Sequence, residues 1–331
     1  HPSDPPRQQP VPEGLHPHTA VRRHLQQLHL LQLRRQVQLL LQVLLLLRHQ
    51  AVVNFAYLGS FYKEPLFMFI GFLFQLLLLF PSNLSAAELE IQTTSGYIVA
   101  ERKSKVLYWQ DIPYAQPPVE DLRWKAPREA SFVDIFPKED NFCIQRPSNL
   151  GGVDGNNFFV GSEDCLYLDI FTPKVDNTEE LPVMFWIHGG GNTSGLKDLY
   201  DFSKMVSRHN VIVVRVNYRL GPFGWFTHPA IQDLQEGEDK TSNFGTLDLI
   251  MALKWVNKNI SNFGGDPENV TIFGESAGGH NVLALLVSKQ AKDLFHKAIS
   301  MSGYTTSISK KDAYQPSKES ATSKYSSARV V

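Results

Sequence analysis

The chain of 331 residues is long enough for one large α/β domain, or two ordinary ones, with a well-buried core. Its 32 Lys and Arg nearly balance its 33 Asp and Glu, which argues against a nucleic-acid partner. The charge is unevenly placed, since residues 1–67 hold seven basic and three acidic side chains, whereas residues 88–331 hold 25 and 30. These two regions are therefore expected to have different roles.

Residues 1–67 are expected to be low-complexity sequence that takes no part in the fold. No acidic residue occurs between Glu13 and Glu64, and the 27 residues from His24 to Gln50 contain twelve Leu and seven Gln. An amphipathic helix on a membrane surface is the alternative for such a composition. However, the leucines follow no helical period of ~3.5 or ~3.6 residues. The pattern favours low-complexity sequence over a functional helix.

Residues 68–87 are predicted to be a signal peptide. The apolar run at 66–80 contains 15 residues, fewer than the ~20 that span a bilayer. A proline, a polar stretch and the small residues Ser85 and Ala87 follow, which is the layout before a cleavage site after Ala87. An uncleaved membrane anchor is the alternative. The protein is therefore expected to be secreted or periplasmic, or else membrane-anchored, with no other membrane partner.

The chain has two cysteines, Cys143 and Cys165. In an exported protein an even pair favours one disulfide, whereas two free, buried thiols are the alternative in a cytosolic protein. Because the segment at 68–87 favours export, the disulfide is the preferred interpretation.

From residue 88 onward, short strands alternate with helices. A hairpin with its turn near Ser95 and Gly96 is predicted first. Apolar runs without polar alternation, typical of buried parallel strands, lie at 181–191, 210–220, 269–276 and 297–303. Helical patterns between them cover 198–209, 246–259 and 277–288. This order predicts one continuous α/β domain with a doubly wound, mostly parallel sheet at 88–331.

The stretch IFGESAGGHNV, residues 272–282, places Ser276 between Gly274 and Gly278. A buried strand is predicted just before it and a helix just after it, and a serine in such a sharp turn needs neighbours without bulk. The turn holds the hydroxyl clear of the sheet at the positive end of a helix, where a developing anion is favoured. Ser276 is therefore the predicted nucleophile. A helix-capping serine in a tight turn is the alternative.

Three consecutive glycines, Gly189 to Gly191, follow another predicted strand. The backbone amides of Gly190, Gly191 and Ala277 are predicted to form an oxyanion hole. A plain flexible loop is one alternative, and a phosphate cradle is another, although no Lys-Ser/Thr follows the glycines. His188 beside them is expected to have a packing or loop-ordering role rather than to act as a base. No pattern predicts a metal or an organic cofactor.

With both motifs in place, the chain resembles the carboxylesterase/cholinesterase (type B) family of the α/β-hydrolase fold. The resemblance runs from about Glu88 to Gly303 and includes the segments at 112–127, 162–173, 186–191, 216–226, 242–256, 259–279 and 294–303. It implies hydrolysis of carboxylic esters through an acyl-enzyme on Ser276. It also implies that Cys143 pairs with Cys165 to close a loop near the rim of the active-site gorge.

The resemblance implies further roles around the nucleophile. Glu275, Arg219 and Asp266 match motif positions that are expected to brace the fold rather than to react. Asn192 departs from the family pattern, which usually has an aromatic residue after the glycines. This departure is expected to change the shape of the acyl pocket but not the hole itself.

A serine hydroxyl needs a histidine to take its proton and a carboxylate to orient that histidine. The resemblance implies that both follow far along the chain, and only 55 residues follow Ser276. His280 is expected to lie behind the serine, one helical turn further on, and His296 to pack at a helix end. No later acid follows a strand, the acids being Asp293, Asp312 and Glu319. We therefore expect a chain truncated at its C-terminus, without a triad acid or histidine and inactive alone.

The sequence thus predicts part of a serine carboxylesterase that acts on a small-molecule ester. A non-catalytic, cholinesterase-like binding or adhesion protein is the alternative on the same fold. An acyltransferase or another serine hydrolase would share the elbow and differ in the acceptor.

Overall fold

The computed structural model describes residues 90–314, apart from 104, 134, 136, 139–140, 152–157 and 175–178. The predicted low-complexity segment 1–67 and the predicted signal peptide 68–87 lie outside the described residues. Within the described part, no helix is long and apolar enough to cross a bilayer. The described part falls within the domain predicted at 88–331.

A small β-hairpin opens the fold. Strands β1 (Glu90–Thr93) and β2 (Gly96–Val99) pair antiparallel, which confirms the predicted hairpin. Gly96 has a positive φ of 140°, and a Cβ at this position would lie 1.6 Å from the carbonyl oxygen of Val133. Only glycine fits this turn, because any side chain would overlap the neighbouring backbone.

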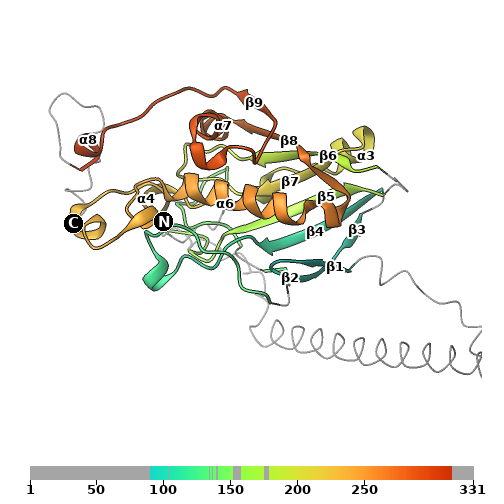
Figure 1. The fold of residues 1–331 in the computed structure, drawn as a ribbon, viewed down its shortest axis with the longest axis horizontal. Coiled ribbons are helices and arrows are strands. Elements are labelled where there is room, and N and C mark those ends of the chain that lie inside the picture. Colours follow the sequence, from blue (N-terminus) through green and yellow to red (C-terminus); the bar gives the residue numbers. More distant parts are fainter. Residues whose placement is uncertain are drawn as a thin grey trace, which may run out of the picture. The chain divides into compact units, whose positions relative to one another are not determined.

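The main sheet has seven strands among the described residues, in the order β3-β4-β5-β7-β6-β8-β9 (Figure 1). Their bounds are Glu101–Lys103 (β3), Val106–Pro113 (β4), Tyr167–Pro173 (β5), Leu181–Ile187 (β6), Ile212–Val216 (β7), Gly265–Glu275 (β8) and Lys297–Met301 (β9). Strands β7, β6, β8 and β9 pair in parallel, whereas β3, β4, β5 and β7 pair antiparallel. Only β3 and β5 therefore run against the common direction, and the predicted α/β sheet is confirmed as mixed and mostly parallel.

Three helices connect the parallel strands, as the strand-helix alternation predicts. They are α3 (Ser203–His209) between β6 and β7, α6 (Phe244–Asn259) between β7 and β8, and α7 (Ala277–Val287) between β8 and β9. The remaining helical elements are short: α4 (Gly221–Gly224), α5 (Pro229–Gln232), α8 (Lys310–Tyr314) and the 3₁₀ turns Glu120–Leu122, Lys197–Leu199, Gly237–Asp239, Ile260–Phe263 and Lys289–Ala291.

The helix predicted at 198–209 begins later than expected, at Ser203. The carboxylate of Asp201 accepts a hydrogen bond of 2.9 Å from the Ser203 amide, which gives the backbone a local alternative to the helix. The other two predicted helices agree with α6 and α7 to within two residues at each end.

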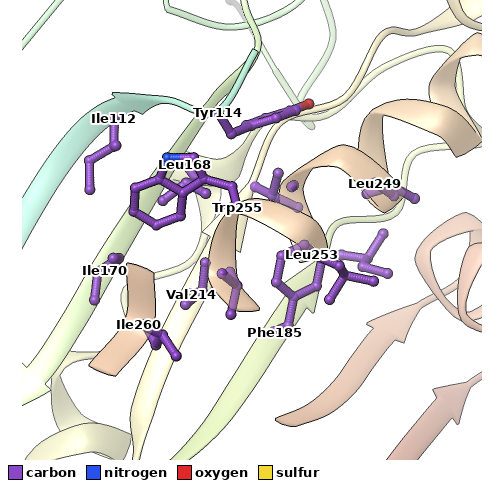
Figure 2. Close-up of a cluster of buried hydrophobic side chains, with 14 of the residues drawn as sticks. Ile112, Tyr114, Leu168, Ile170, Phe185, Val214, Leu249, Leu253, Trp255 and Ile260 are labelled. Carbon is purple, nitrogen blue, oxygen red and sulfur yellow. The ribbon is translucent and has the colours of Figure 1, made fainter. Parts of the chain in front are cut away.

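One face of the sheet packs against α6 through apolar side chains, which Figure 2 shows. On β6, Val183, Phe185 and Ile187 point to this face, whereas Trp186 belongs to the cluster on the opposite face. This alternation follows from the two-residue period of a strand. Leu253 of α6 is fully buried against the same face. The central strands, which lack a polar alternation, are therefore buried on both faces.

The opposite face packs against α3 and also contains an ionic cluster of Asp111, Asp169, Lys197, Asp198 and Arg215, of which all but the exposed Asp198 are buried. The Lys197 Nζ lies 2.8 Å from Asp111, 2.9 Å from Asp169 and 2.9 Å from Asp198. Arg215 Nε donates a 2.7 Å hydrogen bond to Asp169. Two buried cations are thus compensated by two buried carboxylates and by the exposed carboxylate of Asp198.

Candidate active site

Ser276 forms the sharp turn between β8 and α7 that the sequence predicts. Its φ of 55° and ψ of −120° lie in a region that non-glycine residues rarely adopt. The turn requires the backbone at Gly278 to approach β6 closely. A Cβ on Gly278 would lie 2.1 Å from the carbonyl oxygen of Ile187. Glycine at this position therefore lets α7 start directly beside the end of β6.

Two backbone hydrogen bonds hold the elbow. The Ser276 amide donates to the carbonyl of Met301 in β9 over 2.9 Å, and the His280 amide donates to the Ser276 carbonyl over 2.9 Å. The serine is half-buried, and in the part of the chain that the structure describes its Oγ makes no hydrogen bond. The hydroxyl is thus not consumed by a capping or packing interaction.

The glycine loop forms a tight turn after β6. The carbonyl of Gly190 accepts hydrogen bonds from the amides of Thr193 and Ser194, at 3.1 and 3.0 Å. Gly190 and Gly191 both have positive φ, 101° and 64°. Within the described residues, neither of their amides donates a hydrogen bond. Two backbone donors therefore stay available at the end of the sheet.

The loop lies directly against the elbow. A Cβ on Gly189 would lie 2.7 Å from the Glu275 carbonyl oxygen and 3.3 Å from the Cβ of Ser276. Ala277 begins α7, and the first amides of a helix have no intrahelical acceptor. The structure thus brings together the four residues that the sequence predicts for the nucleophile and the hole: Ser276, Gly190, Gly191 and Ala277.

His188 is buried beneath the glycine loop. Its ring stacks on Tyr218 at 4.4 Å between centroids, and its Nδ1 lies 2.8 Å from the Gly189 carbonyl. Burial lowers the pKa of His188 to about 4. The ring is therefore neutral at physiological pH and packs beneath the loop, which is the role predicted for it.

The histidines after Ser276 face other groups. The His280 ring packs edge-on against Tyr304 at 5.3 Å. His296 lies at the start of β9, where its Nδ1 accepts from the Val270 amide over 3.2 Å. Val270 precedes Ser276 by six residues along β8, which separates His296 from the nucleophile by roughly 20 Å. Among the described residues, no histidine hydrogen-bonds the Ser276 hydroxyl.

The motif residues that were expected to brace the fold make structural contacts. Arg219 and Asp248 form a buried, two-pronged ion pair with bonds of 2.8 and 2.7 Å. Asp266 accepts from the Glu268 amide over 2.8 Å at the beginning of β8. Glu275 is exposed, and its carbonyl forms part of the contact with the glycine loop.

The structure joins Cys143 and Cys165 by a disulfide, as predicted. The loop that it closes supports the turn after the glycines through one buried carboxamide. Gln145 donates to the Gly195 carbonyl over 2.9 Å and accepts from the Gly195 amide over 2.8 Å. The disulfide loop therefore helps to position the glycine loop.

Sequence reasoning missed three residues that support the hole: Gln145, Tyr218 and Asn281. The Tyr218 hydroxyl donates to the His188 carbonyl over 2.6 Å, and Asn281 donates to the Asn192 side chain over 2.9 Å. In the sequence, only the departure of Asn192 from the family pattern pointed to this supporting contact. Its partner could not be identified, because 89 residues separate the two asparagines in sequence.

Comparison with known proteins agrees with this geometry. The model of the carboxylesterase family matches residues 87–327. The chain belongs to the carboxylesterase family. This confirms the resemblance seen in the motifs and, with it, the α/β-hydrolase fold.

Individual family members match over the same region. A para-nitrobenzyl esterase of Bacillus subtilis is 44% identical over 228 residues, which cover 67% of this chain and 45% of the relative. A liver carboxylesterase of Sus scrofa is 43% identical over 224 residues, which cover 63% of this chain and 38% of the relative. The chain thus spans less than half the length of these carboxylesterases.

Solved structures show the same relationship. A thermophilic para-nitrobenzyl esterase superposes with a TM-score of 0.59 at 41% identity, over 67% of this chain and 45% of that structure. A Geobacillus stearothermophilus carboxylesterase superposes with a TM-score of 0.54 at 34% identity, over 64% and 43%. The seven-stranded sheet therefore corresponds to part of the fold of these enzymes.

Proposed function

We propose that this chain is part of a serine carboxylesterase in which Ser276 is the nucleophile. The observation that carries the proposal is the strained turn at Ser276, which places a half-buried hydroxyl beside the glycine loop. The Oγ attacks the ester carbonyl, and the amides of Gly190, Gly191 and Ala277 stabilise the oxyanion. The alcohol then leaves, and water hydrolyses the acyl-enzyme.

In this proposal, the histidine base and the carboxylate that orients it lie outside the described residues. Of the eleven histidines in the chain, five are described, and none of these five has its ring hydrogen-bonded to the Ser276 hydroxyl. We infer that the base and acid are supplied by the part of the carboxylesterase fold that this chain does not span. The chain alone is then a fragment with a formed nucleophile site and no efficient turnover.

The proposal extends to the remaining regions and to the substrate. Residues 88–331 form the N-terminal part of the hydrolase domain, 68–87 a signal peptide, and 1–67 a segment outside the fold. The protein is secreted or periplasmic, or membrane-anchored if the signal remains uncleaved. Its substrate is a small-molecule ester, and the chemistry uses no cofactor.

Site-specific labelling tests the nucleophile. We would incubate the full chain and its Ser276→Ala variant with a fluorophosphonate, and add imidazole as a dissolved base. The serine oxygen bonds to phosphorus, fluoride leaves, and imidazole accepts the hydroxyl proton. Peptide mass spectrometry should find the label on Ser276 ahead of every other serine. Labelling of Ser276 no faster than of exposed serines would remove the esterase proposal.

Turnover tests the missing base. Without added imidazole, the full chain should hydrolyse p-nitrophenyl acetate no faster than Ser276→Ala. A Ser276-dependent burst would show that this chain supplies its own base. Among the described residues no histidine ring bonds the Ser276 hydroxyl, which also favours a non-catalytic, cholinesterase-like binding or adhesion role as the second function. That role requires both an unlabelled Ser276 and no turnover.

A further inference from the structure

Two carboxamides connect the two halves of the proposed oxyanion hole. Asn281 lies in α7, five residues after Ser276, and its side chain is buried. Asn192 directly follows Gly191 and has a positive φ of 58°. The Nδ2 of Asn281 donates a 2.9 Å hydrogen bond to the Oδ1 of Asn192. The nucleophile's helix and the glycine loop are thus tied together through side chains.

This connection has no equivalent among the described residues. No other side-chain hydrogen bond joins the loop at 188–195 to α7 in that part of the chain. The Tyr218 hydroxyl lies 3.4 Å from Asn192 Oδ1, but it lies only 2.6 Å from the His188 carbonyl, which takes its proton. Asn281 is therefore the principal donor to the Asn192 side chain.

The backbone of Asn192 is fixed as well. Its carbonyl accepts a 2.6 Å hydrogen bond from the Gly221 amide. Because its carbonyl and its side chain are both hydrogen-bonded, Asn192 has little freedom to rotate. This also restricts the peptide unit that joins Asn192 to the carbonyl of Gly191. The Asn192 side chain is thus hydrogen-bonded to α7, at the position where the family usually has an aromatic residue.

An oxyanion hole requires donors from separate elements to converge on one oxygen. Small displacements of such donors reduce their effect strongly, because the stabilisation depends on preorganised geometry. The amide of Ala277 moves with α7, whereas those of Gly190 and Gly191 move with the loop. A direct hydrogen bond between the loop and α7 can therefore control how closely these three amides converge.

We propose that Asn281 is a positioning residue, which holds Asn192 and so keeps the amides of Gly190 and Gly191 opposite that of Ala277. This inference rests on the proposed function, since it assigns the hole a task in oxyanion stabilisation. Asn281 itself does not touch the substrate.

A double-mutant cycle tests this role. The rate of fluorophosphonate labelling at Ser276, with imidazole present, is measured for Asn281→Ala, Asn192→Ala and the double variant. Each single variant should react about 10-fold more slowly, since a misplaced donor loses part of the ~100-fold effect of a deleted one. The double variant should be no slower than either single variant, because both remove the same connection.

Asn262→Ala is the matched control. Asn262 lies just before β8, at the opposite end of that strand from Ser276. Its side chain donates a 3.0 Å hydrogen bond to the Gln92 carbonyl. Its removal should leave the labelling rate unchanged. Losses that multiply in the double variant, or an unaltered rate in Asn281→Ala, would overturn the proposal.

A spectrum of ¹⁵N-glycine-labelled protein separates this inference from the proposed function. Asn281→Ala and Asn192→Ala should shift the same two signals, those of Gly190 and Gly191, and Asn262→Ala should shift neither. If the wild-type chain does not label at Ser276, the proposed function fails, and these shared shifts alone decide whether the connection exists. Unshifted Gly190 and Gly191 signals would overturn the inference in either case.

Discussion

The two faces of the sheet are buried by different means. The face under α6 is covered by apolar side chains such as Phe185, Val214 and Leu253, whereas the face under α3 also holds the ionic cluster around Lys197. An apolar face adjusts to a substitution that preserves volume. An ionic cluster does not, because each charge depends on its partners for compensation. The second face should therefore respond more sharply to a substitution that preserves volume.

The electrostatics of the ionic cluster show this dependence. Burial raises the pKa of Asp169, but its pairing with Lys197 and Arg215 outweighs burial, so the pKa lies below its usual range. Burial raises the pKa of Asp111 above its usual range despite the nearby Lys197. The two carboxyl groups therefore rely on the same lysine to different extents.

Loss of Lys197 should give the largest effect. Lys197→Met leaves Asp111 and Asp169 buried without one of their cations, which should lower the free energy of unfolding by about 4 kcal/mol. Denaturant titration measures the change. Lys258→Met is the control, since Lys258 pairs with Glu129 at the surface, and it should cost at most ~1 kcal/mol. Equal costs for the two lysines would abolish the distinction between the faces.

The α6 face is tested by Leu253→Ala, which should cost about 3 kcal/mol through lost burial and the cavity left behind. Leu253→Met preserves volume and should cost less than ~1.5 kcal/mol. The same denaturant titrations apply. If the methionine variant were as unstable as the alanine variant, the apolar face would not be the more tolerant one.

His188 makes stability depend on pH. Burial lowers its pKa to about 4, while the unfolded chain binds the proton near its ordinary value of about 6.5. The unfolded state therefore holds more protons between these values, and stability falls as the pH falls through this range. Between pH 7 and pH 5 the loss should be about 2 kcal/mol.

Variants isolate this contribution from that of the carboxyl groups. His188→Gln should remove the pH-dependent loss, measured as the difference between denaturant titrations at the two pH values. His209→Gln, at an exposed position at the end of α3, should retain the wild-type dependence. A slope that survives in His188→Gln would locate its origin elsewhere.

The edge strand β9 should give the smallest change in stability. All five of its residues are exposed, so neither face resembles the covered centre of the sheet. Ile299→Lys should alter the free energy of unfolding by no more than ~0.5 kcal/mol. It should raise solubility, because a charge on an exposed apolar edge opposes strand pairing between molecules. Light scattering at increasing concentration would measure this, and unchanged aggregation would contradict it.

Local patterns were sufficient to predict most of the fold. The apolar runs of β6, β7, β8 and β9 and the helical periods of α6 and α7 depend on residues close in sequence. The elbow at Ser276 and the glycine loop were predicted for the same reason, since each requires small neighbours within a few positions. The structure then places these two motifs beside each other, as their positions after neighbouring parallel strands imply.

Long-range polar contacts could not be predicted. The ionic cluster joins Asp111 to Lys197 across 86 positions, and neither residue has a local feature that marks it as buried. Asn281 likewise has no local feature beyond its place in a predicted helix. The antiparallel strands β4 and β5 also have no continuous apolar run, because Gln110, Asp111 and Asp169 interrupt them. Such pairings depend on the assembled sheet.

A crystal structure of the chain after reaction with a fluorophosphonate tests the central claim most directly. The claim predicts phosphorus bonded to Ser276 Oγ and the phosphonyl oxygen ~2.7–3.1 Å from the amide nitrogens of Gly190, Gly191 and Ala277. A phosphonyl oxygen that points into solvent, away from all three amides, would contradict it.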